Sequence, residues 1–408
     1  MKKETFLLCA LLLFACEQQV DGDKIKARED IDLTRSQEVL VEKGNTFAFR
    51  LLGQVNLEES KENFCISPFS VSQALSMTLN GAAGNTATEM ISALGFEGYT
   101  QSEINAYQQK MNQALLSLDP STNIGIANSI WIREDFAVRK EFVDTNTYYF
   151  DAEVQNLPFD AAALNAINNW CDVKTKGRID KILDDIDPDD IMFLLNALYF
   201  KGSWVHKFDK TKTEEADFYL AGGEKTKVNM MYQKAEFPYY EDETVQVVEL
   251  PFGNEAFSMV FVLPRQGVDM DALIETLDAP CWANWLHRLR ETELNLKLPR
   301  FNLEYEIGLI PTMSALGMTS AFDPQRADFS LINADQDLYI GLLKQKTFVK
   351  VDEEGAEAAA VTIVGIKLTS APLDEIHMTL DRPFLFVIKE KSTSCVLFMG
   401  RIGNPQDK

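Results

Sequence analysis

The chain has 408 residues, enough at about 150 residues per domain for two or three domains, and its composition is that of a soluble globular protein. With 46% apolar and 25% charged residues, it cannot be collagen-like, disordered or a multi-span membrane protein. The 62 acidic residues outnumber the 39 basic ones and give a formal net charge of -23, which argues against binding of DNA or RNA. With only three histidines, catalysis by histidine and metal binding have few candidate residues. We expect no catalytic residues and no metal site, and the sequence indicates no need for a cofactor.

The amino terminus has the pattern of a bacterial export signal. Two lysines precede an apolar run from Phe6 to Ala15, which is too short to cross a bilayer as a helix, because that takes about 20 residues. The run ends in Leu13-Phe14-Ala15-Cys16, which resembles the motif at which a bacterial lipoprotein is cut and lipidated. We therefore predict a lipoprotein signal peptide over residues 1–15 and lipidation of Cys16. An ordinary signal peptide cut elsewhere is the alternative.

Residues 16–36 form a polar stretch without apolar periodicity and are expected to be a flexible tether. The protein would be exported and anchored at the outer membrane or cell surface, or secreted, and the lipid would be its only contact with a membrane. Residues 37–408 contain no linker rich in Pro, Gly or Ser, no long block of charge and no repeat. We predict that they form a single, monomeric domain.

Helices and strands are predicted from the spacing of apolar residues. Apolar residues three and four apart predict helices over residues 37–55, 70–79, 102–118 and 161–176. Strand-like runs cover residues 124–132, 192–200, 245–250, 257–263, 293–298, 338–343 and 384–388. Because helices dominate the first half and strands the second, the pattern predicts a mixed α+β fold and not a doubly wound parallel sheet.

Four cysteines lie in the predicted domain: Cys65, Cys171, Cys281 and Cys395. They are far apart in the sequence and include no CxxC pair, so the spacing fits neither a zinc site nor the dense disulfides of a small secreted protein. We expect isolated buried thiols.

Motifs of several enzyme classes are missing from the sequence. It contains no GxSxG, HExxH, P-loop or GxGxxG, so hydrolase, metalloprotease and nucleotide-binding functions have no motif to support them. The acidic run over residues 184–190 lacks the glycine and terminal glutamate of a calcium-binding EF-hand loop. A solvated turn is the better interpretation of that run.

Residues 351–382 combine the patterns of a buried strand and of an exposed loop. A helix built on the alanines at 358–360 is disfavoured by glycines at 355 and 365 and by four β-branched residues between them. Read with period two, one face of a strand would carry no charge at all, since it holds Ala356, Ala358, Ala360, Thr362, Val364 and Ile366. The next residues, Lys-Leu-Thr-Ser-Ala-Pro, are typical of an exposed and cleavable loop.

Short motifs from Gln37 to Pro405 make the chain resemble the serpin family, and in particular its bacterial lipoprotein members. In family order they are Asn63-Phe64, Ser67-Pro68-Phe69-Ser70, Leu79-Asn80-Gly81-Ala82, Asn196-Ala197-Leu198-Tyr199-Phe200-Lys201-Gly202-Ser203-Trp204, Glu249-Leu250-Pro251-Phe252, Leu298-Pro299-Arg300-Phe301, Leu316-Gly317-Met318, Ala327-Asp328-Phe329-Ser330, Glu353 to Ala360, Arg382-Pro383-Phe384 and Phe398-Met399-Gly400-Arg401.

The resemblance implies a serpin fold of three β-sheets with eight or nine helices and an exposed reactive-centre loop. In that family a protease cleaves the loop and is trapped as an acyl-enzyme when the freed loop inserts into the main sheet as an extra strand. The chain would then be no enzyme, and its partners would be target proteases, bound covalently. We expect broad inhibition of serine proteases, extending to cysteine proteases. A non-inhibitory serpin that acts as a carrier or as a simple protease substrate is the alternative.

The resemblance also implies roles for individual residues. Family spacing from Glu353 makes Thr369 the donor of the scissile carbonyl and Ser370 its leaving-side neighbour. Lys367 would suit a trypsin-like pocket and Leu368 a chymotrypsin- or subtilisin-like one, so both are alternative reactive positions. The residues that match the mobile hinge are Glu353, Glu354, Gly355, Ala356, Glu357, Ala358, Ala359 and Ala360.

Four residues outside the loop match the region over which the sheet opens. Trp204 would lie where the loop first enters the sheet, and Ser67 and Asn196 near its centre. Gln345 stands where many family members have a histidine, but an amide can still form hydrogen bonds. Plain packing is the alternative for each of these side chains.

Overall fold

The computed structural model describes residues 27–356 and 375–407, and within them the chain has an α+β fold. Its nine α-helices are α1 (Arg35–Glu58), α2 (Pro68–Leu79), α3 (Gly84–Ala93), α4 (Gln101–Ser117), α5 (Lys140–Phe150), α6 (Ala161–Lys174), α7 (Met270–Thr276), α8 (Ala279–Arg288) and α9 (Ile310–Ala315), with short 3-10 turns at Lys210–Lys212 and Ser320–Phe322. The fifteen strands form three sheets. The predicted fold class, three sheets and eight or nine helices, is confirmed.

The largest sheet has nine strands in the order β1-β15-β14-β8-β7-β6-β9-β13, with β5 paired to β6. Its members are β1 (Phe64–Ile66), β5 (Glu214–Tyr219), β6 (Lys225–Glu241), β7 (Val245–Phe252), β8 (Phe257–Pro264), β9 (Arg290–Pro299), β13 (Ile376–Thr379), β14 (Phe384–Glu390) and β15 (Val396–Ile402). Every residue of β7, β8 and β14 is buried. These buried, mostly apolar strands therefore form the centre of the core, and the buried charges Glu249 and Lys389 within them form an ion pair at 2.9 Å.

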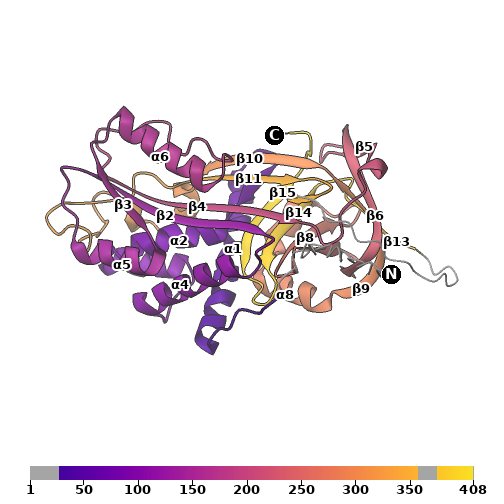
Figure 1. Ribbon diagram of the computed structural model, residues 1–408, viewed down its shortest axis with the longest axis horizontal. Coiled ribbons are helices and arrows are strands. Elements are labelled where there is room, and N and C mark those ends of the chain that lie inside the picture. Colours follow the sequence, from indigo (N-terminus) through magenta and orange to yellow (C-terminus); the bar gives the residue numbers. More distant parts are fainter. Residues whose placement is uncertain (1–26, 357–374, 408) are drawn as a thin grey trace, which may run out of the picture.

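The two smaller sheets lie beside each other and carry the site described below. One has the order β12-β4-β2-β3, and the other pairs β10 with β11. Their strands are β2 (Asn123–Arg133), β3 (Glu153–Leu157), β4 (Met192–Ser203), β10 (Phe301–Gly308), β11 (Lys344–Val351) and β12 (Gly355–Ala356). In Figure 1 the long ribbons of β2 and β4 run between α6 on one side and α2, α4 and α5 on the other.

Helix α2 packs beneath these sheets and is buried on all sides, which its sequence allows. Pro68 occupies the first turn, where its missing N–H costs nothing, and the Ser67 hydroxyl caps the helix by accepting from the Ser70 N–H. Eleven of its residues are buried, including four serines or threonines. A helix that is buried all round cannot be shifted without disturbing the strands above it.

The periodicity predicted four helices and six strands correctly, and one predicted strand is wrong. Residues 338–343 form no strand, and β11 begins only at Lys344. Leu338 is buried, but Tyr339 and Leu342 are exposed, and the Leu343 carbonyl accepts from the Leu309 N–H instead of from a neighbouring strand. The continuous apolar run therefore reflects a loop that packs irregularly against the core and not a ladder of strand hydrogen bonds.

The cysteines are free, as expected, but their burial differs. Cys65, Cys171 and Cys395 are buried, whereas Cys281 is only partly buried, so the expectation that all four are buried is wrong for Cys281. Burial raises the pKa of the Cys171 thiol to about 12. That thiol is therefore protonated and inert near neutral pH.

The acidic run after α6 forms an exposed turn. The Asp187 carboxylate accepts the Asp189 N–H, and the Asp190 carboxylate accepts the Asp187 N–H. In residues 27–356 and 375–407 no cluster of His, Cys, Asp or Glu has the geometry to hold a metal ion. Over the same ranges, no helix is both long enough and apolar enough to span a bilayer.

Candidate functional site

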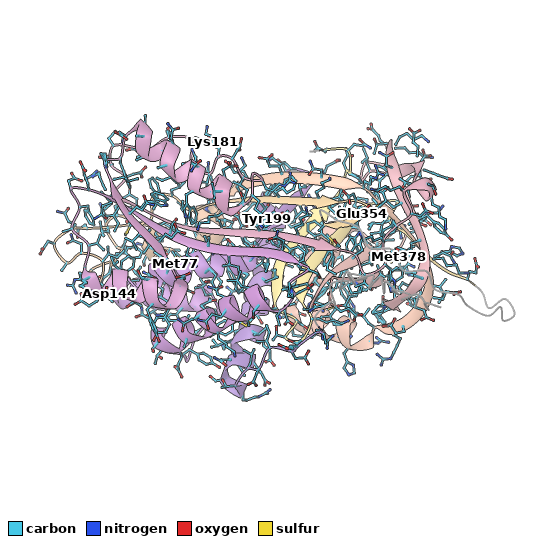
Figure 2. All side chains as sticks on the ribbon, viewed as in Figure 1. Met77, Asp144, Lys181, Tyr199, Glu354 and Met378 are labelled. Atoms are coloured by element: carbon cyan, nitrogen blue, oxygen red, sulfur yellow. The ribbon has the colours of Figure 1, made fainter. Side chains whose placement is uncertain are left out.

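The first part of the hinge already forms a strand against the end of β4. Gly355 lies opposite Ser203 and Ala356 opposite Gly202 in antiparallel register. Two further backbone bonds extend the contact, because the Trp204 N–H donates to the Glu354 carbonyl at 2.9 Å and the Phe208 N–H donates to the Glu353 carbonyl at 3.0 Å. In Figure 2 Glu354 lies toward the opposite end of the molecule from Asp144 of α5.

Two glycines allow this close approach of backbones. Gly355 has a φ of 149°, and a Cβ there would lie 2.2 Å from the Gly202 carbonyl oxygen. A Cβ on Gly202 would in turn lie 2.7 Å from the Phe252 ring. Both positions therefore need the residue without a side chain.

Ala356 is the first residue of the uncharged strand face that the sequence predicts. Its side chain is buried beside Phe200 of β4 and Val349 of β11, next to a void of about 10 Å³. A larger or charged side chain has no room between these two strands. The small residue at position 356 therefore permits the hinge to lie within the sheet.

The two glutamates at the start of the hinge form ion pairs. Glu353 is 2% exposed, and it accepts hydrogen bonds from the Arg300 guanidinium and the Thr213 hydroxyl. Glu354 pairs with Lys210 at 2.8 Å and with Lys207 at 3.1 Å. Hydrogen bonds from Lys210 and then Lys207 hold the pKa of the Glu354 carboxyl below its ordinary value. The Glu354 carboxylate is therefore ionised at neutral pH, and the ion pairs of both glutamates fix the base of the loop.

Trp204 supports the turn that leads into the hinge. Its indole Nε1–H donates to the Asp352 carbonyl at 2.9 Å, and its ring stacks on Phe252 with 4.4 Å between centroids. The side chain is buried. The structure therefore places Trp204 directly beneath residues 352–355.

The central region consists of two separate hydrogen-bonded pairs. On the β11 side, Gln345 accepts from the Ser67 N–H and donates to the Ser67 carbonyl, both at 2.9 Å. On the β4 side, the Asn196 amide donates to Asn128 at 2.8 Å. The Asn196 Oδ1 atom is sealed from solvent and has no hydrogen-bond partner in the described part of the chain. Ser67, Asn196 and Gln345 thus lie in one region, but no hydrogen bond joins β4 to β11 there.

From the hinge to this region and beyond it, β4 and β11 face each other across a gap. Within residues 27–356 and 375–407, β4 pairs with β2 along one edge and only with the two-residue strand β12 along the other. Strand β11 pairs with β10 along one edge, and Asp352, which follows it, forms a single bridge to Gly355. A cavity of about 510 Å³ lies between the two strands, above α2, at the level of Asn196 and Gln345 and on their far side from the hinge. The two facing edges therefore carry backbone groups that another strand could pair with.

The chain is anchored again after the loop. It returns to the described region at Glu375, whose carboxylate lies 2.8 Å from the Lys234 ammonium. Strand β13 then pairs in parallel with β9, with Ile376 opposite Leu294. Both ends of the segment 357–374 are thus attached to sheets.

Several predicted site residues lie outside the described residues: Cys16, Glu357, Ala358, Ala359, Ala360, Lys367, Leu368, Thr369 and Ser370. Their assigned roles stay predictions. Conversely, the sequence reasoning did not identify Arg300, Thr213, Lys207 and Lys210 as partners of the hinge. A glutamate destined for burial needs a cation, but sequence alone does not tell which distant basic residue supplies it.

Comparisons with known proteins give one family. A family model described as serpin (serine protease inhibitor) matches residues 42–405. Human leukocyte elastase inhibitor is 33% identical over 372 residues, which cover 88% of this chain and 97% of that protein. The solved native state of tengpin, a thermophilic serpin, has a TM-score of 0.83 at 33% identity and covers 93% of this chain. Human thyroxine-binding globulin complexed with its hormone has a TM-score of 0.83 at 27% identity and covers 91% of this chain.

Proposed function

The chain belongs to the serpin family, whose members are not enzymes and are mostly protease inhibitors, and we propose that it is a suicide-substrate inhibitor of endopeptidases. One observation carries this proposal. The small hinge residues Gly355 and Ala356 already pair with the end of β4, at the mouth of a gap whose two edges are unpaired within the described ranges. A cleaved loop could therefore continue the pairing that begins at Gly355 and Ala356 and insert as a strand into the gap between β4 and β11.

The proposed reaction begins as ordinary proteolysis. The nucleophile of the protease attacks the carbonyl of Thr369, the Thr369–Ser370 bond breaks, and Ser370 leaves with a new amino group. The protease then holds residue 369 as an acyl-enzyme. Insertion of the loop before water hydrolyses that ester or thioester traps the protease.

The energy for trapping would come from the unpaired edges. Each inserted residue extends the new strand by about 3.3 Å, and each net hydrogen bond contributes about 1 kcal/mol. Burial of the uncharged face that begins at Ala356 adds apolar stabilisation. The native protein would withhold this energy behind a kinetic barrier.

The loop sequence supports broad specificity. Lys367, Leu368 and Thr369 offer side chains suited to trypsin-like, chymotrypsin- or subtilisin-like and elastase-like pockets. Serine proteases are the expected targets, and cysteine proteases that cleave the same loop would be trapped in the same way.

We also propose that the protein is an exported, lipid-anchored serpin of the bacterial lipoprotein type. Beyond the family, the chain resembles the bacterial lipoprotein serpin miropin, and the motif at Cys16 supports lipid anchoring after export. A monomer tethered through residues 16–36, at the outer membrane or cell surface, would meet proteases from outside.

A direct test uses three proteases: trypsin, subtilisin and an elastase. We expect complexes that resist denaturant, with release of a carboxy-terminal peptide whose mass shows a first residue of Ser370, Thr369 or Leu368. Cleavage without any complex would contradict inhibition. It would favour the second candidate, a non-inhibitory serpin. The similarity to human thyroxine-binding globulin is the observation that supports this candidate.

A further inference from the structure

Strand β2 is longer than the strand that covers its outer edge. Residues 123–132 pair with β4 on one side, but β3 pairs only with residues 129–133 on the other. Within the described ranges, no backbone hydrogen bond joins residues 123–128 to a segment on the β3 side. In Figure 1 β2 extends beyond β3 toward the middle of the molecule, below α6 and above α4. About 20 Å of strand therefore presents free N–H and C=O groups at this edge.

The free part of this edge lacks the features that usually prevent pairing with another chain. Charged side chains and proline are common protections of an edge strand. Strand β5 carries three acidic residues, and β3 begins at Glu153 and is followed by Pro158. Residues 123–128, by contrast, are uncharged, and residues 124–127 are only partly buried. This stretch is therefore suited to pairing with a further strand.

The last turns of three helices border the same edge. Helix α4 ends just before the turn that leads into β2. At the end of α5, the Phe150 carbonyl accepts from the Asn128 amide at 2.7 Å. At the end of α6, the Lys174 carbonyl oxygen lies 3.5 Å from the position that a Cβ on Gly125 would take. A strand added to β2 would therefore lie among these three helix ends.

Exposed apolar side chains lie in these three last turns. They are Leu116 of α4, Tyr148 of α5 and Val173 of α6, which are 49%, 68% and 62% exposed. Apolar side chains that gather on one part of a surface mark a site of interaction with another protein. The edge therefore has apolar side chains near it that a bound strand could cover.

The start of this edge carries positive charge, although the whole chain is acidic. The Lys176 ammonium donates to the Asn123 side chain at 2.7 Å and forms no ion pair within the described part of the chain. Lys201 of β4 lies opposite Asn123. A carboxylate at this end of a bound strand would therefore be attracted by the Lys176 ammonium.

We propose that the free edge of β2 binds an extended segment of a partner protein as an added strand. The bound segment has uncharged residues along positions 124–127 of β2 and a carboxylate beside Lys176. Backbone hydrogen bonds supply the affinity, and the alternating side chains supply the selectivity. Since β4 separates β2 from the gap beside β11, this docking does not require the gap and goes beyond the proposed inhibition.

The binding test uses a defined peptide, acetyl-Glu-Val-Thr-Val-Thr-Val-Glu-amide. Calorimetry with the full chain should give one site per molecule. The same peptide with its three valines replaced by proline should bind at least tenfold more weakly, because proline has no N–H to donate. The peptide with lysine in place of both glutamates should bind at least threefold more weakly. Equal binding of the valine and proline peptides would overturn the proposal.

Hydrogen exchange shows where the peptide binds. Amide exchange in residues 123–128 should slow at least tenfold when the peptide is bound, while exchange in β11 stays unchanged. Slower exchange in β11 instead would place the peptide in the gap between β4 and β11 and overturn the proposal. Slower exchange of residues 123–128 at high protein concentration without peptide would show that a second copy covers the edge, which would also overturn it.

Matched variants test the edge and its charge. Ile124→Lys places a protecting charge on the edge and should weaken binding at least tenfold, whereas Ile124→Val should change it less than twofold. Lys176→Glu should weaken binding at least threefold, and Lys297→Glu, an exposed lysine of β9, less than twofold. Equal effects of the two lysine variants would contradict the assignment, even if Ile124→Lys fails to fold. None of these measurements uses a protease, so they decide this site whether or not the chain inhibits one.

Discussion

Under the proposed mechanism, we expect single residues at the hinge to decide between trapping and simple cleavage. Gly355 is fixed by the contact of its backbone with Gly202, and Ala356 by the lack of space between β4 and β11. Both requirements are steric. They apply to the native protein as well as to the inserted strand, because residues 355 and 356 already pair with β4.

A charged replacement at position 356 should abolish inhibition without preventing cleavage. In Ala356→Glu, insertion would have to bury a carboxylate beside Phe200 and Val349, which costs several kcal/mol because the lysine that lines the same void, Lys350, is already paired with Asp352. We expect cleaved inhibitor and free protease on a denaturing gel, with complex reduced at least tenfold. Ala356→Ser is the matched control and should keep most of the complex. Full complex with the glutamate variant would mean that residue 356 does not face the sheet interior.

The buried carboxylate of Glu353 should depend on Arg300. Removal of the guanidinium in Arg300→Gln leaves an almost fully buried charge without a cation, although Thr213 still donates to it. Since Arg300 is 39% exposed, we expect a loss of about 2 kcal/mol and not the full cost of breaking a buried pair. The first unfolding transition in urea measures it.

Two controls isolate that pair. Lys234→Gln removes an exposed ion pair at the other end of the loop and should change stability by less than about 0.5 kcal/mol. Adding Glu353→Gln to Arg300→Gln should restore part of the loss, because no unpaired charge then remains. An equal loss in the single and double variants would show that Arg300 acts by packing alone.

At the scale of helices and strands, the sequence predicted an element correctly where its apolar residues repeat with a clear helical or strand period. Helices α1, α2, α4 and α6 show apolar residues three and four apart, and the pattern gives each of them nearly to its ends. Strand β11 was missed because its first two buried residues, Gln345 and Thr347, are polar and hide the alternation, while the apolar run just before it is a loop. Continuous apolar residues indicate burial, but they do not distinguish a strand from an irregular segment.

At the hinge, some features of the candidate site could be predicted from the sequence and others could not. The small residues of 355–360 and the uncharged strand face are visible in the sequence. The cation beside Glu353 is Arg300, which precedes β10, and the cations beside Glu354 are Lys207 and Lys210, which follow β4. Only the folded chain brings these distant residues together. The split between the Gln345 pair and the Asn196 pair likewise depends on side-chain geometry.

The junction between α3 and the 3-10 turn at 320–322 should weaken in acid. Burial opposes ionisation of Glu89, but hydrogen bonds from Ser320, Thr319 and Asn85 outweigh it and lower the pKa to about 2. A lowered pKa stabilises the fold fully above about pH 4.5, and the contribution is lost as pH falls from there to about 2. Glu89→Gln should therefore cost about 1 kcal/mol at pH 7 and little at pH 2, as urea unfolding at both pH values will measure. An equal cost at both would contradict a role for the charge.

At the scale of the whole molecule, the native protein combines a docked hinge with an incomplete sheet. Within the described residues, the gap between β4 and β11 holds only the two-residue strand β12, which pairs with the end of β4. We infer a fold held short of its most stable arrangement, with the missing strand present as the loop that follows Ala356. Stability should therefore rise when the loop is cut.

The measurement that tests this claim most directly compares intact protein with protein cut once within the loop. Thermal unfolding gives the stability, and hydrogen exchange of β4 and β11 gives the state of their edges. We predict a rise in unfolding temperature of at least 20 °C, together with new protection of backbone amides in both strands. The same unfolding temperature and the same exchange before and after cleavage would contradict insertion, and with it the account of inhibition.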